Sequence, residues 1–545
     1  MIRINNLSVS FDDKTPLEQL AAKRLELPPQ SIAGVVIVRK AIDARRYKGA
    51  PIKNVYMLDV EVAGNEKKLI TRFKKDKNIS YLSTGEQEQT VTWGKGKPLD
   101  DNVNTDRPPV VVGFGPAGMF AALELARHGF KPMVLERGRD VDSRHNDIQS
   151  FWRGGEFDKV SNVQFGEGGA GTFSDGKLTT RISDPLMRYV LQDFVNAGAP
   201  DDIMYLHKPH IGTDILRQVV RNIRQEIIRL GGTVRFESQV TGIEVKNGRL
   251  EAVIAGDAER IETSTAFFGI GHSARDTYHM LKSAGLLMEP KPFAIGVRIE
   301  HPQELIDRAQ YGEDAGHNML PVADYSLTYN NRESGRSCYS FCMCPGGQVV
   351  AAASEDGGVV TNGMSNYKRN SGIANSALLV NVRPEDFKNE VLGGIAFQRE
   401  WEQAAFRIGG GSYYAPVQTA GDFLAGRSGS KNYLTAPSYR PGVVASDLRK
   451  CLPGFVTATL AEALPYFDKK IPGFADDGAA MTGVETRSSA PCRIVRDRES
   501  FISMSVDGFY PIGEGAGYAG GIMSAALDGV NASRAFFDKI RNKRI

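Results

Sequence analysis

A single stretch, residues 110–136, limits most strongly what this chain can fold into. It reads VVVGFGPAGMFAALELARHGFKPMVLE. Two short apolar runs rich in β-branched residues flank a run of helix formers, which predicts a βαβ unit with buried parallel strands. Gly113, Gly115 and Gly118 form the pattern G-x-G-x-x-G. The first glycine allows a tight turn, the second lets a pyrophosphate approach the backbone, and the third lets helix and strand pack closely.

The residues around this motif point to a bound dinucleotide. Pro116 and Ala117 begin a helix whose N-terminal N–H groups would face an anion. Glu136 ends the second strand 23 residues after Gly113, where an acid can bind a ribose hydroxyl and would repel the extra phosphate of NADP. Arg137 follows it directly. The motif alone is compatible with either FAD or NAD.

A second glycine-rich stretch, residues 508–529, favours FAD. It reads GFYPIGEGAGYAGGIMSAALDG and contains another G-x-G-x-x-G. No second βαβ unit with a terminal acid follows it, so an NAD site is not expected here. Gly513 and Glu514 instead end a strand, and Gly520-Gly521 open a helix at Ile522. The acid can bind the ribityl chain of a flavin, and the helix N-terminus can face the flavin edge that gains negative charge on reduction.

A third glycine-rich loop, FGEGGAGTFSDGKL at residues 165–178, would let the backbone approach a flat ligand. Flavin-disulfide reductases carry a redox cysteine pair in a comparable region, and this loop contains no cysteine. In RSCYSFCMC at residues 336–344, a strand would place Cys338, Cys342 and Cys344 on one face. We expect free buried thiols there, with a flavin-facing thiol as the alternative. No second Cys/His pair has the spacing of a metal site.

Two charged residues near the end of the chain are candidates for contact with cofactor or substrate. Glu485 and Arg487, in TGVETRSSAP at residues 482–491, would share one face of a strand. The guanidinium fork of Arg487 suits an anionic substrate or a flavin, with a structural ion pair as the alternative. His272, in Gly271-His272-Ser273 after a buried strand, is the other catalytic candidate.

The order of these motifs predicts an α/β protein with three parts. Residues 1–95 form a basic, ferredoxin-like α+β domain, and residues 96–109 are a linker with three prolines. Residues 110–285 and 479–545 are the two parts of a Rossmann-like FAD-binding domain. Residues 286–478 are an inserted α+β substrate domain. Because both cofactor anchors must reach one flavin, we expect the insert to lie over the ring as a cap.

Charge and composition narrow the partners and the compartment. Residues 1–100 carry 18 Lys and Arg against 12 Asp and Glu, a net charge of +6, whereas the whole chain is +3. The cluster that includes Arg39, Lys40, Arg45, Arg46 and Lys48 is a solvated or docking face, with an anionic partner such as RNA as the alternative. No aromatic RNA-binding motif accompanies it, which argues against nucleic acid.

Five cysteines are too few and odd in number for a disulfide framework. No apolar signal region or membrane-length apolar run is present. A cytoplasmic protein without a membrane contact is expected.

Taken together, these motifs resemble the FAD-dependent dehydrogenases of the two-dinucleotide-binding superfamily, which have a glutathione-reductase-like fold. The chain is most similar to a poorly characterised bacterial family of NAD(FAD)-utilising or FAD-dependent proteins, through GFGPAGMFAA, GGAGTFSDGKL, PHIGTD, FCMCPGG, GVETRSSAP and GEGAGYAGGI. The resemblance implies non-covalent FAD and a redox role, with no defined substrate. It places around the cofactor Gly113, Gly115, Pro116, Ala117, Gly118, Glu136, Arg137, Gly169, Ala170, Gly171, Thr172, Asp175, Gly176, Lys177, Gly271, Glu485, Arg487, Gly513, Glu514, Gly520, Gly521 and Ile522.

Two hypotheses about function follow. The first is an FAD-dependent oxidoreductase that moves hydride between flavin and a small-molecule, possibly anionic substrate, with NAD(P)H as a transient donor. The second is a flavin-bearing binding or regulatory protein whose basic N-terminal domain holds an anionic partner.

Overall fold

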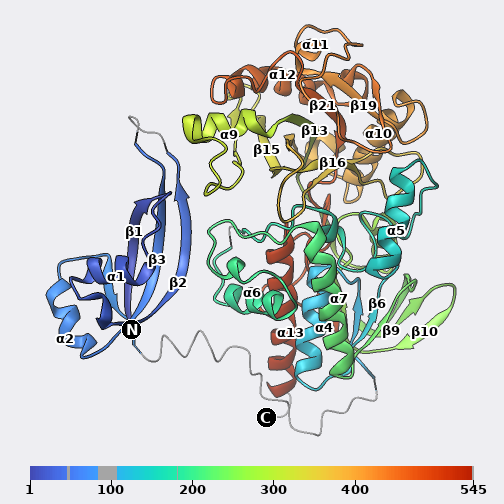
Figure 1. Cartoon of the computed structure of the whole chain (residues 1–545). Helices are drawn as coiled ribbons and strands as arrows, with labels where there is room; N and C mark the ends of the chain where they lie inside the picture. The colour runs from blue at the N-terminus through green and yellow to red at the C-terminus, as the bar shows by residue number, and fades with distance from the viewer. Residues whose placement is uncertain (46–49, 84–106, 181, 543–545) are drawn as a thin grey trace.

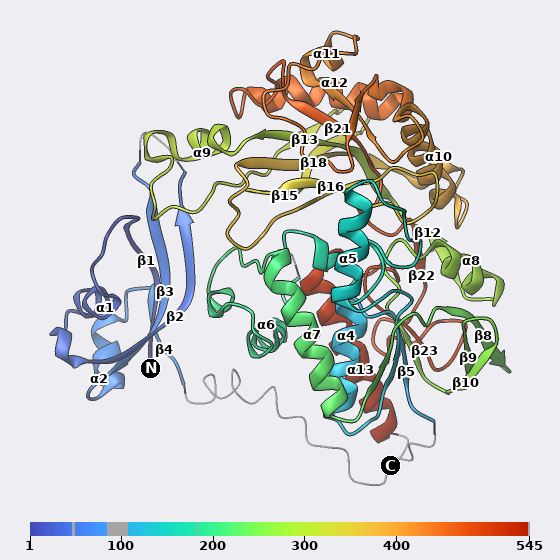
Figure 2. The ribbon, with the colours of Figure 1, turned by 45° about the vertical axis from the view of Figure 1, so that its right-hand side comes forward.

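The computed structural model describes residues 1–45, 50–83, 107–180 and 182–542. The expected linker at 96–109 lies outside these residues except for 107–109, as do residues 84–95 and the basic Arg46 and Lys48. Figures 1 and 2 show an N-terminal sheet, in blue, beside a nucleotide domain with a cap above it. Within the described part of the chain, no helix is both long and apolar enough to cross a membrane.

The N-terminal domain is a four-stranded antiparallel sheet with the strand order β2-β3-β1-β4. Its chain order β-α-β-β-α-β is that of a ferredoxin-like unit. Alternate side chains such as Ile2, Ile4, Leu58 and Val60 are buried under the helices, because successive strand residues face opposite sides of a sheet. The elements are β1 Ile2–Ser10, α1 Leu17–Leu25, β2 Ile32–Asp43, β3 Lys53–Val62, α2 Glu66–Ile70 and β4 Ile79–Tyr81.

Part of the basic stretch in this domain faces the rest of the protein. The backbone of Lys40, on the edge strand β2, bridges to Leu206, and the Arg39 guanidinium lies 2.8 Å from the His207 ring. Phe11 meets His317 of the cap edge to face, with ring centroids 5.0 Å apart. The edge strand β2, and Phe11 just after β1, therefore dock on the rest of the protein.

The nucleotide domain is built on a five-stranded parallel sheet with the order β23-β11-β5-β6-β7. The VVV run of the glycine motif is β5, at its centre. The last strand in the sequence, β23, lies at one edge, so the sheet closes only with the chain's final segment. The strands are β5 Val110–Val112, β6 Met133–Leu135, β7 Thr233–Arg235, β11 Ala266–Phe268 and β23 Phe509–Pro511.

Helices α4, α7 and α13 cover one face of this sheet, and an antiparallel meander covers the other (Figure 2). Val111 packs under the helices, whereas Val110 and Val112 pack against the meander, as strand alternation requires. The C-terminal helix begins at Ile522, as the sequence pattern predicts. The elements are α4 Pro116–Arg127, α7 Thr213–Arg229, α13 Ile522–Asn542, β8 Val240–Lys246, β9 Arg249–Ala255 and β10 Glu259–Glu262, with α5 Val141–Trp152, α6 Met187–Asn196, α8 Arg275–Ser283, β12 Met288–Pro290 and β22 Cys492–Ile494 beside them.

The cap is a seven-stranded mixed sheet with the order β14-β15-β18-β13-β21-β19-β20, packed against helices. Strand β21 pairs with β13 and β19, so the cap runs past residue 478 and the boundary predicted there is wrong. The elements are β13 Phe293–Pro302, α9 Gln303–Tyr311, β14 Thr328–Asn330, β15 Ser337–Cys344, β18 Ile373–Val382, α10 Gly393–Ile408, β19 Ala415–Thr419, α11 Ala420–Leu424, β20 Val443–Ala445, α12 Gly454–Asp468 and β21 Ala480–Glu485, with a hairpin of β16 Gln348–Ala351 and β17 Thr361–Met364.

Helix α5 joins the cap to the nucleotide domain. Its apolar side chains Ile148, Phe151 and Trp152 belong to the same buried cluster as the cap core. The Trp152 indole N–H also donates to the Ala351 carbonyl at 3.3 Å. The cap is therefore held by a continuous core rather than by a flexible hinge.

The crossing of α13 over α4 gives a first test of the packing. A Cβ added at Gly529 would lie 2.1 Å from the Ala117 carbonyl oxygen, a backbone atom that cannot yield without moving α4. We expect Gly529→Ala to lower the free energy of unfolding by about 1–3 kcal/mol, as overpacking does. At Gly454, the first residue of α12, an added Cβ meets no atom within 4 Å. Gly454→Ala should therefore be neutral or slightly stabilising. Urea unfolding of both variants measures this, and equal effects would contradict the close crossing.

Candidate functional site

The glycine turn after β5 is shaped by close backbone contacts. Gly113 has a φ of 91°, and a Cβ there would lie 2.5 Å from the Gly269 carbonyl oxygen. Gly115 precedes α4, and Pro116 is the first residue of the helix. At this position a backbone N–H has no partner within the helix, so the N–H that proline lacks costs nothing. A Cβ at Gly118 would lie 2.0 Å from the Gly113 oxygen, so this glycine packs the helix on the turn. Free N–H groups at the start of α4 thus face the space beside the turn.

Glu136 is buried at the end of β6 and ties three segments together. Its carboxylate accepts hydrogen bonds from the backbone N–H groups of Phe114 at 2.7 Å, Gly138 at 2.9 Å and Gly166 at 2.9 Å. Three bonds leave acceptor capacity for a further donor, because a carboxylate has about four lone-pair sites. The predicted ribose contact is therefore compatible with this geometry. The sequence did not indicate that Glu136 also holds the glycine turn and the 165–178 loop in place.

One cavity collects most of the predicted cofactor residues. Its walls come from the glycine turn, the 165–178 loop, the end of β11, the start of α13 and the cap. Gly271, Gly520 and Gly521 line it, and a Cβ at any of them would meet no atom within 4 Å, so they leave room for a ligand. The predicted residues in the lining are Gly113, Gly115, Pro116, Ala117, Glu136, Arg137, Gly169, Ala170, Gly171, Asp175, Lys177, Gly271, His272, Glu485, Arg487, Glu514, Gly520, Gly521 and Ile522.

Four predicted cofactor residues lie outside the lining and instead hold the backbone. Gly118 packs on the turn, as described above. The Thr172 carbonyl accepts a hydrogen bond from Thr213 at 2.5 Å. A Cβ at Gly176 would lie 2.7 Å from the Gly212 nitrogen. The Gly513 N–H donates to Asp528 at 2.6 Å. These residues shape the site without facing the cavity.

Two side chains of the 165–178 loop bind the cap. Asp175 forms an ion pair with Arg369 and accepts a hydrogen bond from Ser365. The Lys177 ammonium donates to the Met343 carbonyl. Both residues still line the cavity, but their charged groups already have protein partners. The loop therefore connects the nucleotide domain to the cap through side-chain contacts.

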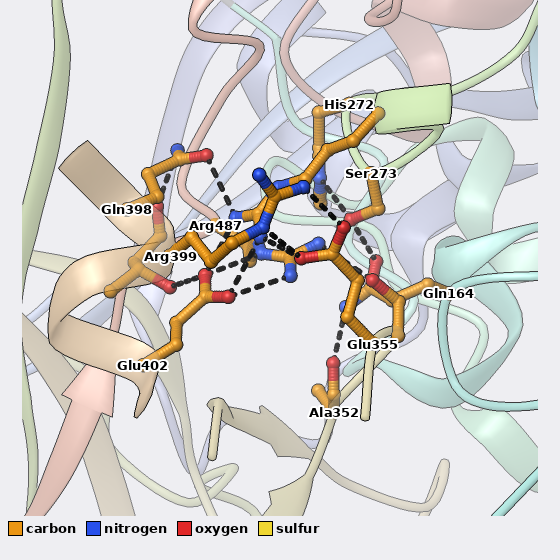
Figure 3. Close-up of polar contacts among 12 residues, drawn as sticks. Gln164, His272, Ser273, Ala352, Glu355, Gln398, Arg399, Glu402 and Arg487 are labelled. Atoms are coloured by element: carbon orange, nitrogen blue, oxygen red, sulfur yellow. Dashed lines mark hydrogen bonds and ion pairs between the residues drawn. The ribbon is translucent and has the colours of Figure 1, made fainter. Parts of the chain in front are cut away.

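Arg487 lines the cavity, but its guanidinium fork is occupied. Its Nε and Nη2 donate to the two oxygens of Glu402 on α10, at 2.7 and 2.9 Å, and Nη1 donates to Ser354 at 2.8 Å (Figure 3). Arg275, at the start of α8, donates to the same carboxylate at 2.8 and 2.9 Å. The fork therefore serves a structural ion pair, which is the alternative that the sequence left open.

Glu402 and its two arginine partners are buried, and the half-buried Glu355 and Arg399 extend their network. Burial favours protonated Glu402, but Arg275 and Arg487 outweigh it and hold the pKa of its carboxyl well below the usual value. Glu355 accepts hydrogen bonds from Arg275 and Arg399, at 2.7 Å from the Arg399 Nη2 (Figure 3). Three guanidinium groups thus face two carboxylates, which leaves one positive charge in excess next to the cavity.

His272 lies at the edge of this network. Its Nδ1 is 2.9 Å from the Ser273 hydroxyl, which also donates to Gln164 at 3.2 Å (Figure 3). Burial, together with Arg487 and Arg275, lowers the pKa of His272 to about 3. The imidazole is therefore neutral at neutral pH, so it keeps one N–H for a hydrogen bond and does not act as an imidazolium acid.

Glu485 pairs with a residue that the sequence analysis did not single out. Its two oxygens accept from Nε and Nη2 of the fully buried Arg298 on β13, at 2.6 and 2.9 Å. Arg487 lies beyond the end of β21, so the two residues do not share a strand face as predicted. A signal was present, because Arg298 and Glu300 interrupt the apolar run FAIGVRIEH. Glu402 does not interrupt an apolar run in this way, so the sequence did not mark it.

The cysteines of β15 are split by a β-bulge. Pairing with β18 shifts between Phe341 and Cys344, and Cys342 has a φ of 42°. Cys338 is buried in the sheet, whereas Cys342 and Cys344 line the cavity, and Cys342 is exposed. The three thiols therefore do not share one buried face, and the alternative of a thiol facing the cofactor cavity is the one the geometry favours. Burial raises the pKa of the Cys344 thiol to about 12.

Burial raises the pKa of Glu514 to about 7, opposed by Lys291. Arg137 pairs with Asp276 at 3.0 Å and lies over the Phe165 ring at 4.4 Å. Across residues 1–45, 50–83, 107–180 and 182–542, no group of three or more His, Cys, Asp or Glu side chains could hold a metal ion.

Comparison with known proteins adds the following. Residues 292–488 match the family described as FAD-dependent protein, C-terminal domain-like, and residues 1–61 match a domain of unknown function, DUF8436. An uncharacterized protein of Clostridium beijerinckii is 49% identical over 540 residues, which cover 99% of each chain.

Two solved structures are among those that resemble this chain. The halogenase PltM in complex with phloroglucinol and FAD is 9% identical, with a TM-score of 0.39 over 80% of this chain and 70% of that one. A geranylgeranyl bacteriochlorophyll reductase-like protein of Thermoplasma acidophilum is 12% identical, with a TM-score of 0.35 over 80% of this chain and 79% of that one.

Because Glu136 holds three backbone segments together, we expect its substitution to lower both cofactor affinity and stability. Glu136→Gln removes the charge and turns an amide N–H toward backbone donors. Hydrogen bonds to charged groups contribute about 1.5–3 kcal/mol, so FAD affinity should fall at least ~10-fold, and the unfolding midpoint should drop. Glu237→Gln, at an exposed acid that pairs with Arg139 at 3.3 Å, is the matched control and should change neither. Fluorescence titration of the apoprotein and urea unfolding measure both quantities. Wild-type values for Glu136→Gln would remove Glu136 from the site.

Proposed function

Because this chain belongs to the same family as the Clostridium beijerinckii protein and contains the C-terminal domain of FAD-dependent proteins, we propose that it is an FAD-dependent oxidoreductase. We propose for it a fold of the glutathione-reductase-like type. FAD is its cofactor. The proposed reaction is hydride transfer between FAD and a small-molecule substrate, with NADH or NADPH as transient donor. The observation that carries the proposal is that a single cavity gathers both glycine anchors and a wall of the cap.

The residues of the cavity fit a dinucleotide. The N–H groups at the start of α4 would bind the pyrophosphate, and Glu136 would accept a bond from the adenosine ribose. Glu514 would accept a bond from the ribityl chain. The N-terminus of α13, after the open Gly520-Gly521 pair, would face the ring edge that becomes negative. When bound, FAD supplies the redox chemistry, and the chain supplies position and charge.

In the proposed reaction, Arg487 contributes its positive charge, whereas its guanidinium N–H groups bind Glu402 and Ser354 rather than the substrate. The excess positive charge of the Arg275, Arg399, Glu355, Glu402 and Arg487 network lies beside the cavity. In a buried site such a charge favours any ligand that gains negative charge during the reaction. His272, neutral at neutral pH, would accept or donate a hydrogen bond without changing charge. The raised pKa of the buried Cys344 argues against a relay between the two cavity thiols, so we do not assign a flavin-disulfide mechanism.

Cofactor content and reduction test the proposal directly. We expect the purified protein to be yellow, with non-covalent FAD near one per chain. Anaerobic addition of NADH or NADPH should bleach the flavin absorbance. FAD bound without bleaching by either donor would favour the flavin-bearing binding protein instead. Absence of flavin even after reconstitution would overturn the cofactor assignment.

The raised pKa of Glu514 predicts a pH dependence of FAD binding. A ribityl hydroxyl that donates to the carboxylate stabilises the ionised form, so binding lowers the pKa and releases a proton below pH 7. The dissociation constant should therefore rise up to tenfold per pH unit below about 7 and stay constant above it. The charged and titratable neighbours that interact with Glu514 are Lys291, Tyr278 and Cys342.

Calorimetry in two buffers of different ionisation enthalpy measures the released proton. Glu514→Gln should abolish both the release and the pH slope. Glu300 is the matched control, because burial raises its pKa to about 7 as well, yet it lies in β13 and does not line the cavity. Glu300→Gln should keep the slope. A slope that survives in Glu514→Gln would remove the ribityl contact.

A further inference from the structure

Arg298 is the most completely bonded charged side chain near the cavity. It is fully buried in the middle of β13, between β18 and β21. Nε and Nη2 donate to Glu485, Nη2 also donates to Asn362 Oδ1 at 3.2 Å, and Nη1 donates to the Cys342 carbonyl at 2.9 Å and to Asn375 Oδ1 at 3.1 Å. A guanidinium has five N–H groups, and each of the five has an acceptor here.

Three of these four partners line the cavity, although Arg298 itself does not. Glu485 comes from β21, Asn362 from β17 and Cys342 from β15. We call the surface formed by Phe341, Cys342, Asn362, Gly363 and Glu485 the cap wall. A Cβ at Gly363 would lie 2.4 Å from Arg298 Nη1, so only glycine lets the hairpin approach the guanidinium. One buried side chain thus fixes three separate segments of the wall.

The bond to Cys342 coincides with the bulge in β15. A φ of 42° is strained for a non-glycine residue and persists only where its surroundings hold it. Here the Cys342 carbonyl accepts from Arg298 and from the Cys344 thiol at 3.2 Å. As a result the Cys342 side chain is exposed, whereas Cys338, Cys344, Cys451 and Cys492 are buried. Because Cys342 lines the cavity, its exposed surface opens toward the ligand space.

A simpler explanation is that Arg298 only neutralises the buried Glu485 carboxylate. An unpaired buried charge is costly, so some cation is required there. That explanation accounts for the two bonds to Glu485 and for none of the other three. It also predicts that removal of both charges together would leave the wall unchanged.

We propose that Arg298 is a positioning residue of the FAD site, which holds the cap wall in place and thereby presents Cys342 to the ligand. This inference rests on the proposed FAD site and extends it to the wall that the substrate meets. The guanidinium is required for its geometry and not only for its charge. Arg298 touches neither cofactor nor substrate and acts through Cys342, Asn362 and Glu485.

Alkylation of Cys342 by iodoacetamide, located by peptide mass spectrometry, reports the position of the wall without any turnover. In the wild type we expect Cys342 to react and Cys344 to stay protected, and bound FAD to slow the Cys342 reaction at least tenfold. In Arg298→Met/Glu485→Gln, which leaves no unpaired charge, Cys344 should become reactive and FAD should slow Cys342 less than threefold. Arg298→Lys keeps the charge but has three donors, and it should behave like the double variant.

Arg336→Met is the matched control. Arg336 pairs with Asp386 at 2.6 Å in the same cap but does not line the cavity, so this variant should label like the wild type. Wild-type labelling and FAD protection in the double variant, or full rescue by Arg298→Lys, would overturn the proposal. If FAD fails to bind even the wild type, the proposed function fails, whereas labelling of FAD-free protein still tests the wall.

Discussion

The structure depends on one buried carboxylate. Glu402, on α10 of the cap, accepts hydrogen bonds from Arg275 of the nucleotide domain and from Arg487 of the segment that returns from the cap. Thr486 adds a hydroxyl donor at 2.6 Å. Loss of Glu402 would leave the buried Arg487 guanidinium without the carboxylate to which it donates, and breaking a buried ion pair costs about 3–5 kcal/mol. The three segments must therefore fold together, and this fixes the cap relative to the cofactor cavity.

The sequence was most informative where function requires a particular backbone. Glycine at Gly113, Gly118 and Gly169 is demanded by positive φ or by close approach, so the turn and the loop could be recognised directly. Strand alternation and β-branched runs likewise predicted the central strands. The boundary at 478 failed because β21 reads as a buried strand in either domain, and only its pairing with β13 decides which sheet it joins.

Side-chain partners were the least predictable feature. Glu485 and Arg487 are two residues apart, yet each pairs with a charge far away in the sequence, Arg298 and Glu402. A local pattern shows that a charge is buried but not what neutralises it. The same limit applies to Glu136, whose position after β6 predicted a ligand contact while its three backbone partners could be seen only in the fold. The bulge at Cys342 has a similar cause, since it follows from a contact with another strand.

The strand order of the nucleotide sheet has a consequence for biosynthesis. The central strands β5 and β11 are among the first parts of the domain to leave the ribosome, but their neighbour β23 and the covering helix α13 are among the last. Until residues 509–542 have emerged, the edge of β11 is unpaired and the apolar face of α4 lacks its partner helix. A nascent chain therefore passes through a long interval with an open sheet edge, a state prone to aggregation. Translation that stops within α13 would pair the β11 edge but leave the apolar face of α4 only partly covered, although almost every cofactor-facing residue is already present.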